Sequence, residues 1–220
     1  MLIKHFKLFI YLYVLIGFSF AFSGSYEDFF KAIKVDNAPA IQRLLARGFD
    51  PNTTDEKGQY GLLLALREPA PNIAAVLIDT PKIDLNVLNP QGESPLMLAA
   101  LKGQLQLAQK MVLKGADVNK TGWTPLHYAA STGQVKVIAF LIENHAYIDA
   151  ESPNGTTPLM MASMYGSPES VKLLLNEGAD PLLKNQQGLT ALQFAQQANR
   201  ADAVQLLSAP GVRQRAAGKW

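Results

Sequence analysis

The chain has 220 residues, of which 48% are hydrophobic and 17% charged, and its formal net charge is +2. It contains no cysteine, which excludes disulfides, thiol nucleophiles, thiolate metal sites and a lipoprotein signal. Two lysines lie in the first 23 residues and three basic residues lie in the last ten, so the segment between them carries a charge near −3. Without a basic stripe or face, we expect no nucleic acid among its ligands.

Residues 1–23 have the layout of a secretory signal peptide. Lys4 and Lys7 precede an almost wholly apolar run that ends near Phe22, and small residues occupy the −3 and −1 positions before a cut after Ser23. Cleavage after Ala21 is an alternative. An uncleaved membrane anchor is a second alternative, although the run is slightly short for a span of about 20 residues. We expect a periplasmic or secreted mature protein.

A short motif recurs through the rest of the chain with a period of 30 to 33 residues. The motif is Ser or Thr, then Pro or Ala, then Leu. Its copies begin at Ser94, Thr124, Thr157 and Thr190. In the copy at Thr124 the hydroxyl is a good N-cap and Pro125 suits the first helical position. A turn at Gly133 and a second apolar pattern over 135–144 follow. Each unit of about 30 residues is too small to bury its own apolar face.

The Thr-Pro-Leu-His sequence at 124–127, the Gly-Ala-Asp-Val-Asn sequence at 115–119 and the period near 33 closely resemble the ankyrin repeat. The resemblance implies an all-α solenoid of about six helix-turn-helix repeats joined by short β-hairpin fingers. It also implies that the ring of His127 bonds backbone between neighbouring repeats. Bacterial ankyrin proteins that are exported with an N-terminal signal peptide are similar in layout.

The expected domains are a signal peptide (1–23), an ankyrin repeat domain (24–209) and a disordered basic tail (210–220). Within the domain, the repeats lie near 26–57, 58–91, 92–121, 122–154, 155–187 and 188–209. The inner and outer helices of the third repeat are expected at 95–101 and 105–114, and those of the fifth at 158–165 and 169–177. The first and last repeats are expected to be atypical, because a terminal repeat needs one polar outer face.

The second repeat departs most from the motif. Tyr60 stands where a capping hydroxyl is expected, and the segment 68–72 replaces the usual glycine-centred turn. Pro69 and Pro71 in this segment predict an extended, rigid connection before a second helix at 73–78. We therefore expect this repeat to be the least stable.

Two positions in the later repeats deserve a specific prediction. His145 aligns with the helix-closing glycines Gly48, Gly115 and Gly178, which predicts a left-handed backbone at this histidine. The connection before Trp123 is three residues shorter than its counterparts, which predicts a notch in the row of fingers.

No catalytic constellation can be assembled from the sequence. Of the three histidines, His5 lies in the signal peptide, and His127 and His145 have no second ligand at metal-binding spacing. Ser131 and Ser163 have no nearby base. We therefore expect no catalytic, cofactor-binding or metal-binding residues, no small-molecule substrate and no cofactor, with an enzyme only as a formal alternative.

The ankyrin resemblance implies a protein partner that binds the concave face, which finger tips and inner helices form. Carried over by position, the candidate partner-binding residues are Gln91, Glu93, Leu101, Lys102, Trp123, Ser131, Thr132, Asn154, Thr156, Met164 and Tyr165. Trp123, Met164 and Tyr165 stand out because aromatic residues and methionine are enriched at interface cores. The alternative is that each packs against a neighbouring repeat. Two further functional hypotheses are an inner-membrane-tethered scaffold, if the N-terminal helix is not cleaved, and a secreted effector.

Overall fold

The computed structural model describes residues 24–209 and residue 212, and every regular element within them is a helix. The expected signal peptide and nearly all of the expected basic tail lie outside the described residues. In chain order, the helical residues 24–34 are followed by α2 (Ala38–Ala46), α3 (Gly61–Arg67), α4 (Pro71–Asp79), α5 (Pro95–Leu101), α6 (Leu105–Leu113), α7 (Pro125–Ser131), α8 (Val135–Glu143), α9 (Pro158–Tyr165), α10 (Pro168–Asn176), α11 (Ala191–Gln197) and α12 (Ala201–Ser208).

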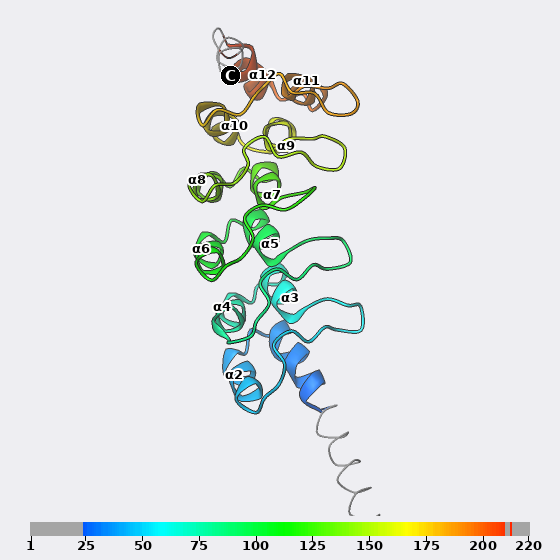
Figure 1. Ribbon diagram of the computed structural model, residues 1–220, viewed down its shortest axis with the longest axis vertical. Coiled ribbons are helices and arrows are strands. Elements are labelled where there is room, and N and C mark those ends of the chain that lie inside the picture. The colour runs from blue at the N-terminus through cyan, green and yellow to red at the C-terminus, as the bar shows by residue number, and fades with distance from the viewer. Residues whose placement is uncertain (1–23, 210–211, 213–220) are drawn as a thin grey trace, which may run out of the picture. The chain divides into compact units, whose positions relative to one another are not determined.

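The helices are divided between two compact units, the first ending at Ile83 and the second beginning at Asp84. The first unit contains two antiparallel helix pairs among its described residues, and the second contains four. In the second unit α5, α7, α9 and α11 pack in sequence as one row, and α6, α8, α10 and α12 lie beside them (Figure 1). We call α5, α7, α9 and α11 the inner helices, because the finger loops extend from their side of the unit.

The inner helices begin as the sequence predicts. The Thr124 hydroxyl accepts a hydrogen bond from the backbone N–H of His127, and Pro125 occupies the first turn of α7. Behind these caps lies a continuous apolar row in which Leu96, Leu126 and Leu159 are fully buried. Each such leucine contributes roughly 2 kcal/mol of hydrophobic stabilisation. Small alanines beside them let successive helices approach closely.

The outer helix α8 ends at Glu143 in a motif that satisfies its last carbonyl groups. The N–H of His145 donates to the Ile142 carbonyl at 3.0 Å, and the N–H of Ala146 donates to the Leu141 carbonyl at 2.9 Å. This is the Schellman pattern, which requires a left-handed residue after the cap. The φ of His145 is +64°, which confirms the prediction made from its alignment with glycines. The sequence-based prediction ended this helix one residue later, at Asn144, which is the C-cap residue in the structure.

A side-chain amide holds the strained His145 peptide in place from the preceding repeat. The Asn119 Nδ2 donates to the His145 carbonyl at 2.8 Å, and the Asn119 Oδ1 accepts from the Tyr147 N–H at 2.8 Å. Asn86 makes the same pair of bonds to Gly115 and Asp117 in the repeat before. In both cases the asparagine amide therefore holds the loop after an outer helix against the preceding repeat.

The second repeat differs from the sequence-based prediction at its proline-rich turn. Pro71 does not lie in an extended connection but begins α4, which runs from Pro71 to Asp79 instead of from 73 to 78. Ala70, the N-cap, offers no side-chain cap. The carboxylate of Asp36 in the first repeat supplies it, accepting from the Ile73 N–H at 3.0 Å and from the Asn72 Nδ2 at 2.7 Å. A proline at the first helical position costs nothing when the missing donor would have been unsatisfied.

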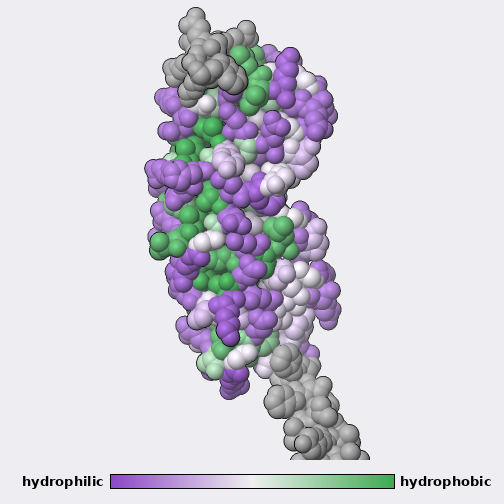
Figure 2. Space-filling model, in the orientation of Figure 1, coloured by the Kyte–Doolittle hydropathy of each residue, from purple (hydrophilic) through white to green (hydrophobic). Residues whose placement is uncertain are grey.

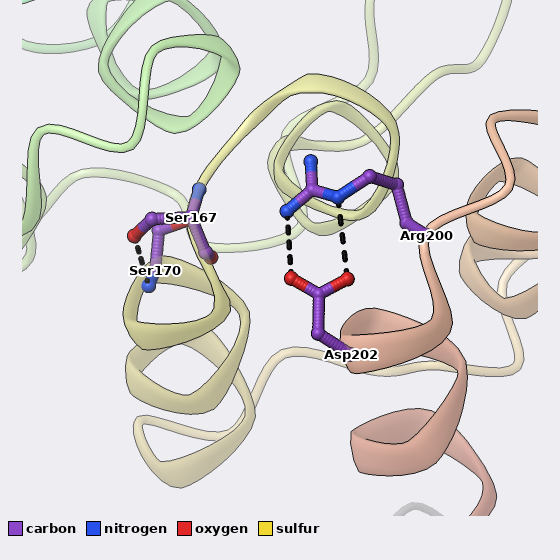
Figure 3. Close-up of polar contacts among 4 residues, drawn as sticks. All are labelled: Ser167, Ser170, Arg200 and Asp202. Carbon is purple, nitrogen blue, oxygen red and sulfur yellow. Dashed lines mark hydrogen bonds and ion pairs between the residues drawn. The ribbon is translucent and has the colours of Figure 1, made fainter.

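Other helix bounds differ from prediction by one residue. α6 ends at Leu113, with Lys114 as its C-cap, and α10 spans Pro168–Asn176 because Ser167 caps it one residue earlier than expected. Ser167 and Ser170 exchange hydrogen bonds across the first turn of α10 (Figure 3).

The fingers are turns rather than regular strands. Among the described residues the bridge between Thr54 and Tyr60 is an isolated β pair, and each of the longer fingers is closed by a few backbone hydrogen bonds at its tip. The expected hairpin fingers are thus present as compact loops with almost no ladder pairing.

The last repeat presents a polar surface, as expected of a terminal repeat. Arg200 and Asp202 form a forked ion pair at the start of α12, with two N–O distances of 3.2 and 3.0 Å (Figure 3). The hydrogen bond from Arg200 lowers the pKa of the Asp202 carboxyl. Because Asp202 lies in the first turn of α12, its negative charge also complements the positive end of the helix dipole.

Candidate functional site

The finger tips are built from short polar side chains that fold back on their own backbone. In the third repeat the Asn89 Oδ1 accepts from the N–H groups of Gln91 and Glu93, at 3.0 and 2.9 Å. The equivalent acceptors in the other long fingers are Asp55, Ser152 and Asn185. A glycine with positive φ follows in each long finger. Most of the hydrogen-bonding groups at these finger tips are therefore already paired within the loop. In Figure 2 the finger loops are coloured mainly as hydrophilic or neutral, whereas hydrophobic surface is gathered over the helices.

The shortened finger of the fourth repeat is closed differently. The ammonium group of Lys120 donates to the carbonyls of Thr121 and Trp123, both at 3.2 Å. A Cβ on Gly122, whose φ is +81°, would lie 3.5 Å from the ring of Pro153 in the next finger. The short finger thus lies against its longer neighbour, and the notch that the sequence predicted beside Trp123 stays a prediction.

Trp123 contributes to packing as well as to surface. Its ring stands edge-on to that of His127, with centroids 5.2 Å apart and an interplanar angle of 77°. The indole is half-buried. This contact with a buried residue of its own repeat gives Trp123 a packing role at the base of the finger.

His127 is fully buried and joins two repeats. Its Nδ1 accepts from the Thr124 N–H at 3.2 Å, so Nε2 carries the ring proton and donates to the Thr156 carbonyl at 2.8 Å. Burial lowers the pKa of His127 to about 4. The ring is therefore neutral at physiological pH, and both of its nitrogens are engaged in holding repeats together.

Glu93 connects the third finger to the next inner helix. Its carboxylate accepts from the Tyr128 hydroxyl at 3.2 Å and from the Asn89 Nδ2 at 2.7 Å. Burial and the nearby carboxylate raise the pKa of Tyr128 to about 12. Glu93 and Tyr128 are both part-buried, so they present a fixed polar group at the base of the finger.

Residues at the ends of the inner helices serve partly to cap them. The Thr132 hydroxyl donates to the Leu101 carbonyl of the preceding inner helix at 2.9 Å, and the Ser131 hydroxyl donates to the Tyr128 carbonyl at 2.8 Å. Lys102 and Thr132 are exposed, whereas Leu101 and Ser131 are half-buried.

The exposed side of α9 is apolar. Tyr165 is 59% exposed, and Met164 is half-buried beside it. Met161, which the sequence analysis left out, is also half-buried and lies one turn earlier on the same side. When the repeats are aligned, Met161 occupies the position of Tyr128, one residue after the position of His127. This alignment could have identified it. A helix that is apolar on its exposed side as well as its buried side is unusual for a solvated surface.

One candidate residue is not available for docking. The side chain of Thr156 is 2% exposed, and its backbone carbonyl is the acceptor for His127. Asn154 and Gln91 are exposed at their finger tips. The structure therefore brings the remaining candidates to the finger tips and inner helices of the third to fifth repeats, within the second unit.

The described residues offer little for metal or membrane binding. No group of three or more histidine, aspartate or glutamate side chains in 24–209 is placed to hold a metal ion. Within the same part of the chain no helix is both long and apolar enough to cross a bilayer. The first unit has an open groove of about 850 Å³ at the ends of α2 and α4, and its lining includes none of the candidate residues.

The family model for ankyrin repeats, in the form of three copies, matches residues 29–121, 62–152, 97–185 and 145–216. The chain belongs to the ankyrin-repeat family. An ankyrin repeat domain from Acinetobacter baumannii has a similar structure, with a TM-score of 0.71 and 28% identity over 81% of this chain and 95% of that one. The all-helical ankyrin solenoid predicted from the sequence is thus confirmed.

Curated relatives share the repeats but are mostly much longer proteins. Ankyrin repeat and SAM domain-containing protein 6 of Rattus norvegicus is 34% identical over 48% of this chain and 12% of its own length. Protein phosphatase 1 regulatory subunit 27 of Mus musculus is 38% identical over 34% of this chain and 50% of its own length. The palmitoyltransferase AKR1 of Lachancea kluyveri is 31% identical over 52% of this chain and 16% of its own length. The chain spans half or less of these relatives, and ankyrin repeats typically mediate protein–protein interaction.

Proposed function

We propose that this ankyrin-repeat protein is a non-enzymatic binding module whose partner is another protein. The partner docks on the inner face, which we define as the exposed side of α5, α7 and α9 with the adjoining finger tips. The observation that carries the proposal is the apolar exposed side of α9, where Met161, Met164 and Tyr165 lie together. Aromatic and methionine side chains of this kind supply the central contacts of many protein interfaces.

The neighbouring inner helix provides an internal comparison. On α11 the exposed positions are filled by Gln193, Gln196 and Gln197. This helix belongs to the terminal repeat, which faces solvent, and it is polar where it is exposed. Position by position the contrast is confined to Met164, which aligns with the exposed Gln197, since Met161 and Tyr165 align with Phe194 and Ala198. The comparison therefore supports a covered surface at α9 through Met164.

The inner face is held rigidly, which favours binding. His127, Thr132 and Asn119 each hydrogen-bond to the backbone of an adjacent repeat. A preorganised surface loses less conformational entropy when it binds. The exposed glutamines of α11, together with Lys102 and the finger-tip amides, would then form a polar rim around the apolar centre.

The cellular setting is part of the same proposal. The positively charged start, apolar run and small residues of positions 1–23 favour export to the periplasm, with cleavage after Ser23 or Ala21. The alternative is a scaffold tethered at the inner membrane by an uncleaved segment. N-terminal sequencing of the mature protein separates the two: a new terminus at residue 22 or 24 supports export, and retention of Met1 in the membrane fraction supports the tether.

Site-specific crosslinking tests the docking surface in the exporting cell. A photoreactive amino acid at position 165 should capture a defined protein, because this side chain is exposed at the centre of the proposed site. The matched control is position 147, where Tyr147 is 69% exposed in the loop after α8. Equal capture from both positions, or capture from 147 alone, would contradict the proposal.

A further inference from the structure

The methionines of the repeat domain fall into two chemically different groups. Met97, Met111 and Met160 are at most 1% exposed. Met161 and Met164 are half-buried on the exposed side of α9. Both groups lie in the same folded domain. Met160 and Met161, one from each group, are adjacent residues of α9.

Two of the buried thioethers are also occupied by hydrogen bonds. The Met97 Sδ accepts from the Ser94 N–H at 3.3 Å, and the Met160 Sδ accepts from the Thr157 N–H at 3.4 Å. In both repeats the sulfur takes the place of the His127 ring at the helix start. These sulfurs are shielded by packing and direct a lone pair at a backbone donor, so an oxidant cannot reach them in the folded protein.

The second pair is less shielded, because both side chains are only half-buried. Met161 and Met164 lie three residues apart, so their side chains are neighbours on one side of the helix. They lie next to Tyr165, whose 59% exposure shows that solvent reaches this end of α9. Solvent access is the main determinant of methionine oxidation in a folded protein.

We propose that Met161 and Met164 form a reversible oxidation site on the inner face. One molecule of hydrogen peroxide per sulfur transfers one oxygen atom to the thioether, which loses two electrons and becomes the sulfoxide. The peroxide O–O bond breaks, and the reduced oxygen leaves as water. A thiol-dependent methionine sulfoxide reductase returns the sulfoxide to the thioether, with the oxygen leaving as water and the thiols becoming a disulfide.

The modification would change the surface without unfolding the repeat. A sulfoxide converts a flexible apolar side chain into a polar one. Met161 and Met164 are partly exposed, so water can solvate a new polar oxygen there, whereas at Met97 or Met160 it would disrupt a helix cap and the core. The loss of an apolar docking surface on oxidation rests on the proposed function, but the chemistry at the two sulfurs does not.

Peptide mass spectrometry after limited treatment with hydrogen peroxide tests the site. In the folded protein, Met161 and Met164 should oxidise at least tenfold faster than Met97, Met111 and Met160. In guanidinium chloride the five rates should converge, because burial no longer distinguishes them. Equal rates in the folded protein, or slower oxidation at 161 and 164, would overturn the proposal.

Two further measurements address reversibility and folding. A mixture of the two epimer-specific sulfoxide reductases should restore both residues in the folded, oxidised protein, and persistence of the sulfoxides would overturn the reversible part. The double variant Met161→Leu, Met164→Leu should take up almost no oxygen under the same conditions. The circular dichroism spectrum of the oxidised wild type should match that of the untreated protein, and a loss of helix would show that a buried sulfur had reacted instead.

Discussion

The Nε2 of His127 donates to the backbone carbonyl of Thr156 at 2.8 Å, which links the inner helix of one repeat to the finger of the next. The ring that makes this bond is fully buried and must stay neutral to keep its second bond from the Thr124 N–H. Protonation therefore opposes folding at this position.

The stability of the protein should fall on mild acidification through His127. Its pKa in the folded protein is about 4, below the value of 6.5 in an unfolded chain. Between these pH values the unfolded chain binds a proton that the folded one does not, so the free energy of unfolding decreases as the pH falls. The expected loss from this residue is about 3 kcal/mol between pH 7 and pH 4, measured by urea unfolding.

A His127→Gln variant isolates this contribution. Glutamine already serves at the equivalent position in the last repeat, where the Gln193 Oε1 accepts from the Thr190 N–H at 2.8 Å. The variant should be less stable than the wild type at pH 7 but should lose less stability on acidification. Parallel pH profiles for the two proteins would show that the buried imidazole is not the titrating group.

Replacing His145 with glycine should stabilise the protein. The φ of +64° at this residue is strained for any side chain with a Cβ, and the Asn119 amide fixes the peptide in that conformation. Relief of the strain, offset by the greater flexibility of glycine in the unfolded chain, should raise stability by up to about 1 kcal/mol. Lys82→Gly provides a parallel case, since Lys82 has a φ of +67°. A lower melting temperature for the His145→Gly variant would contradict the strain argument.

Loss of the Asp36 carboxylate should weaken α4. This carboxylate is the N-terminal cap of a helix that has no side-chain cap of its own. Asp36→Ala should cost about 1 kcal/mol, as other cap deletions do, and should speed amide exchange in residues 71–79. Asp36→Asn keeps an acceptor oxygen and tolerates the positive φ at this position, so it should behave more like wild type. Equal exchange in the two variants would argue against a capping role.

Much of this architecture can be read from local sequence signals. The Thr124 cap, the Pro125 start and the left-handed His145 follow from rules that act within one or two turns of chain, and they repeat at a fixed period. Burial of the leucine row follows from the same period, because stacking is the way a unit this small covers its apolar side.

The features that were missed depend on contacts between repeats. The Asp36 cap lies 37 residues before the Ile73 amide that it bonds, and nothing local marks that pairing. Lys120 is a different case, because the carbonyls of Thr121 and Trp123 to which it donates lie one and three residues away, within the same shortened finger. Thr156 was placed on the surface by its position in the finger, whereas its carbonyl is used by a buried ring in the repeat before it.

Hydrogen exchange should be fastest, within the folded part, in residues 26–91. α3 begins at Gly61 and its N-cap residue, Tyr60, makes no side-chain cap bond, while α4 depends on a cap from another repeat. In repeat proteins each unit is stabilised mainly by its neighbours, so a weak second repeat also lowers the protection of the terminal repeat beside it. Uniform protection from the first repeat to the last would contradict this prediction.

The most direct test of the proposed inner face is the affinity of a Met164→Ala, Tyr165→Ala double variant for the protein captured by crosslinking. Trp123 is left unchanged, because it packs against the buried His127 and its loss would alter stability. Tyr147→Ala is the matched control, since it removes another well-exposed tyrosine from a loop outside the inner face. Binding should weaken by about 2 kcal/mol or more in the double variant, while its melting curve and the affinity of the control stay near wild type. Unchanged affinity of a folded double variant would contradict the account.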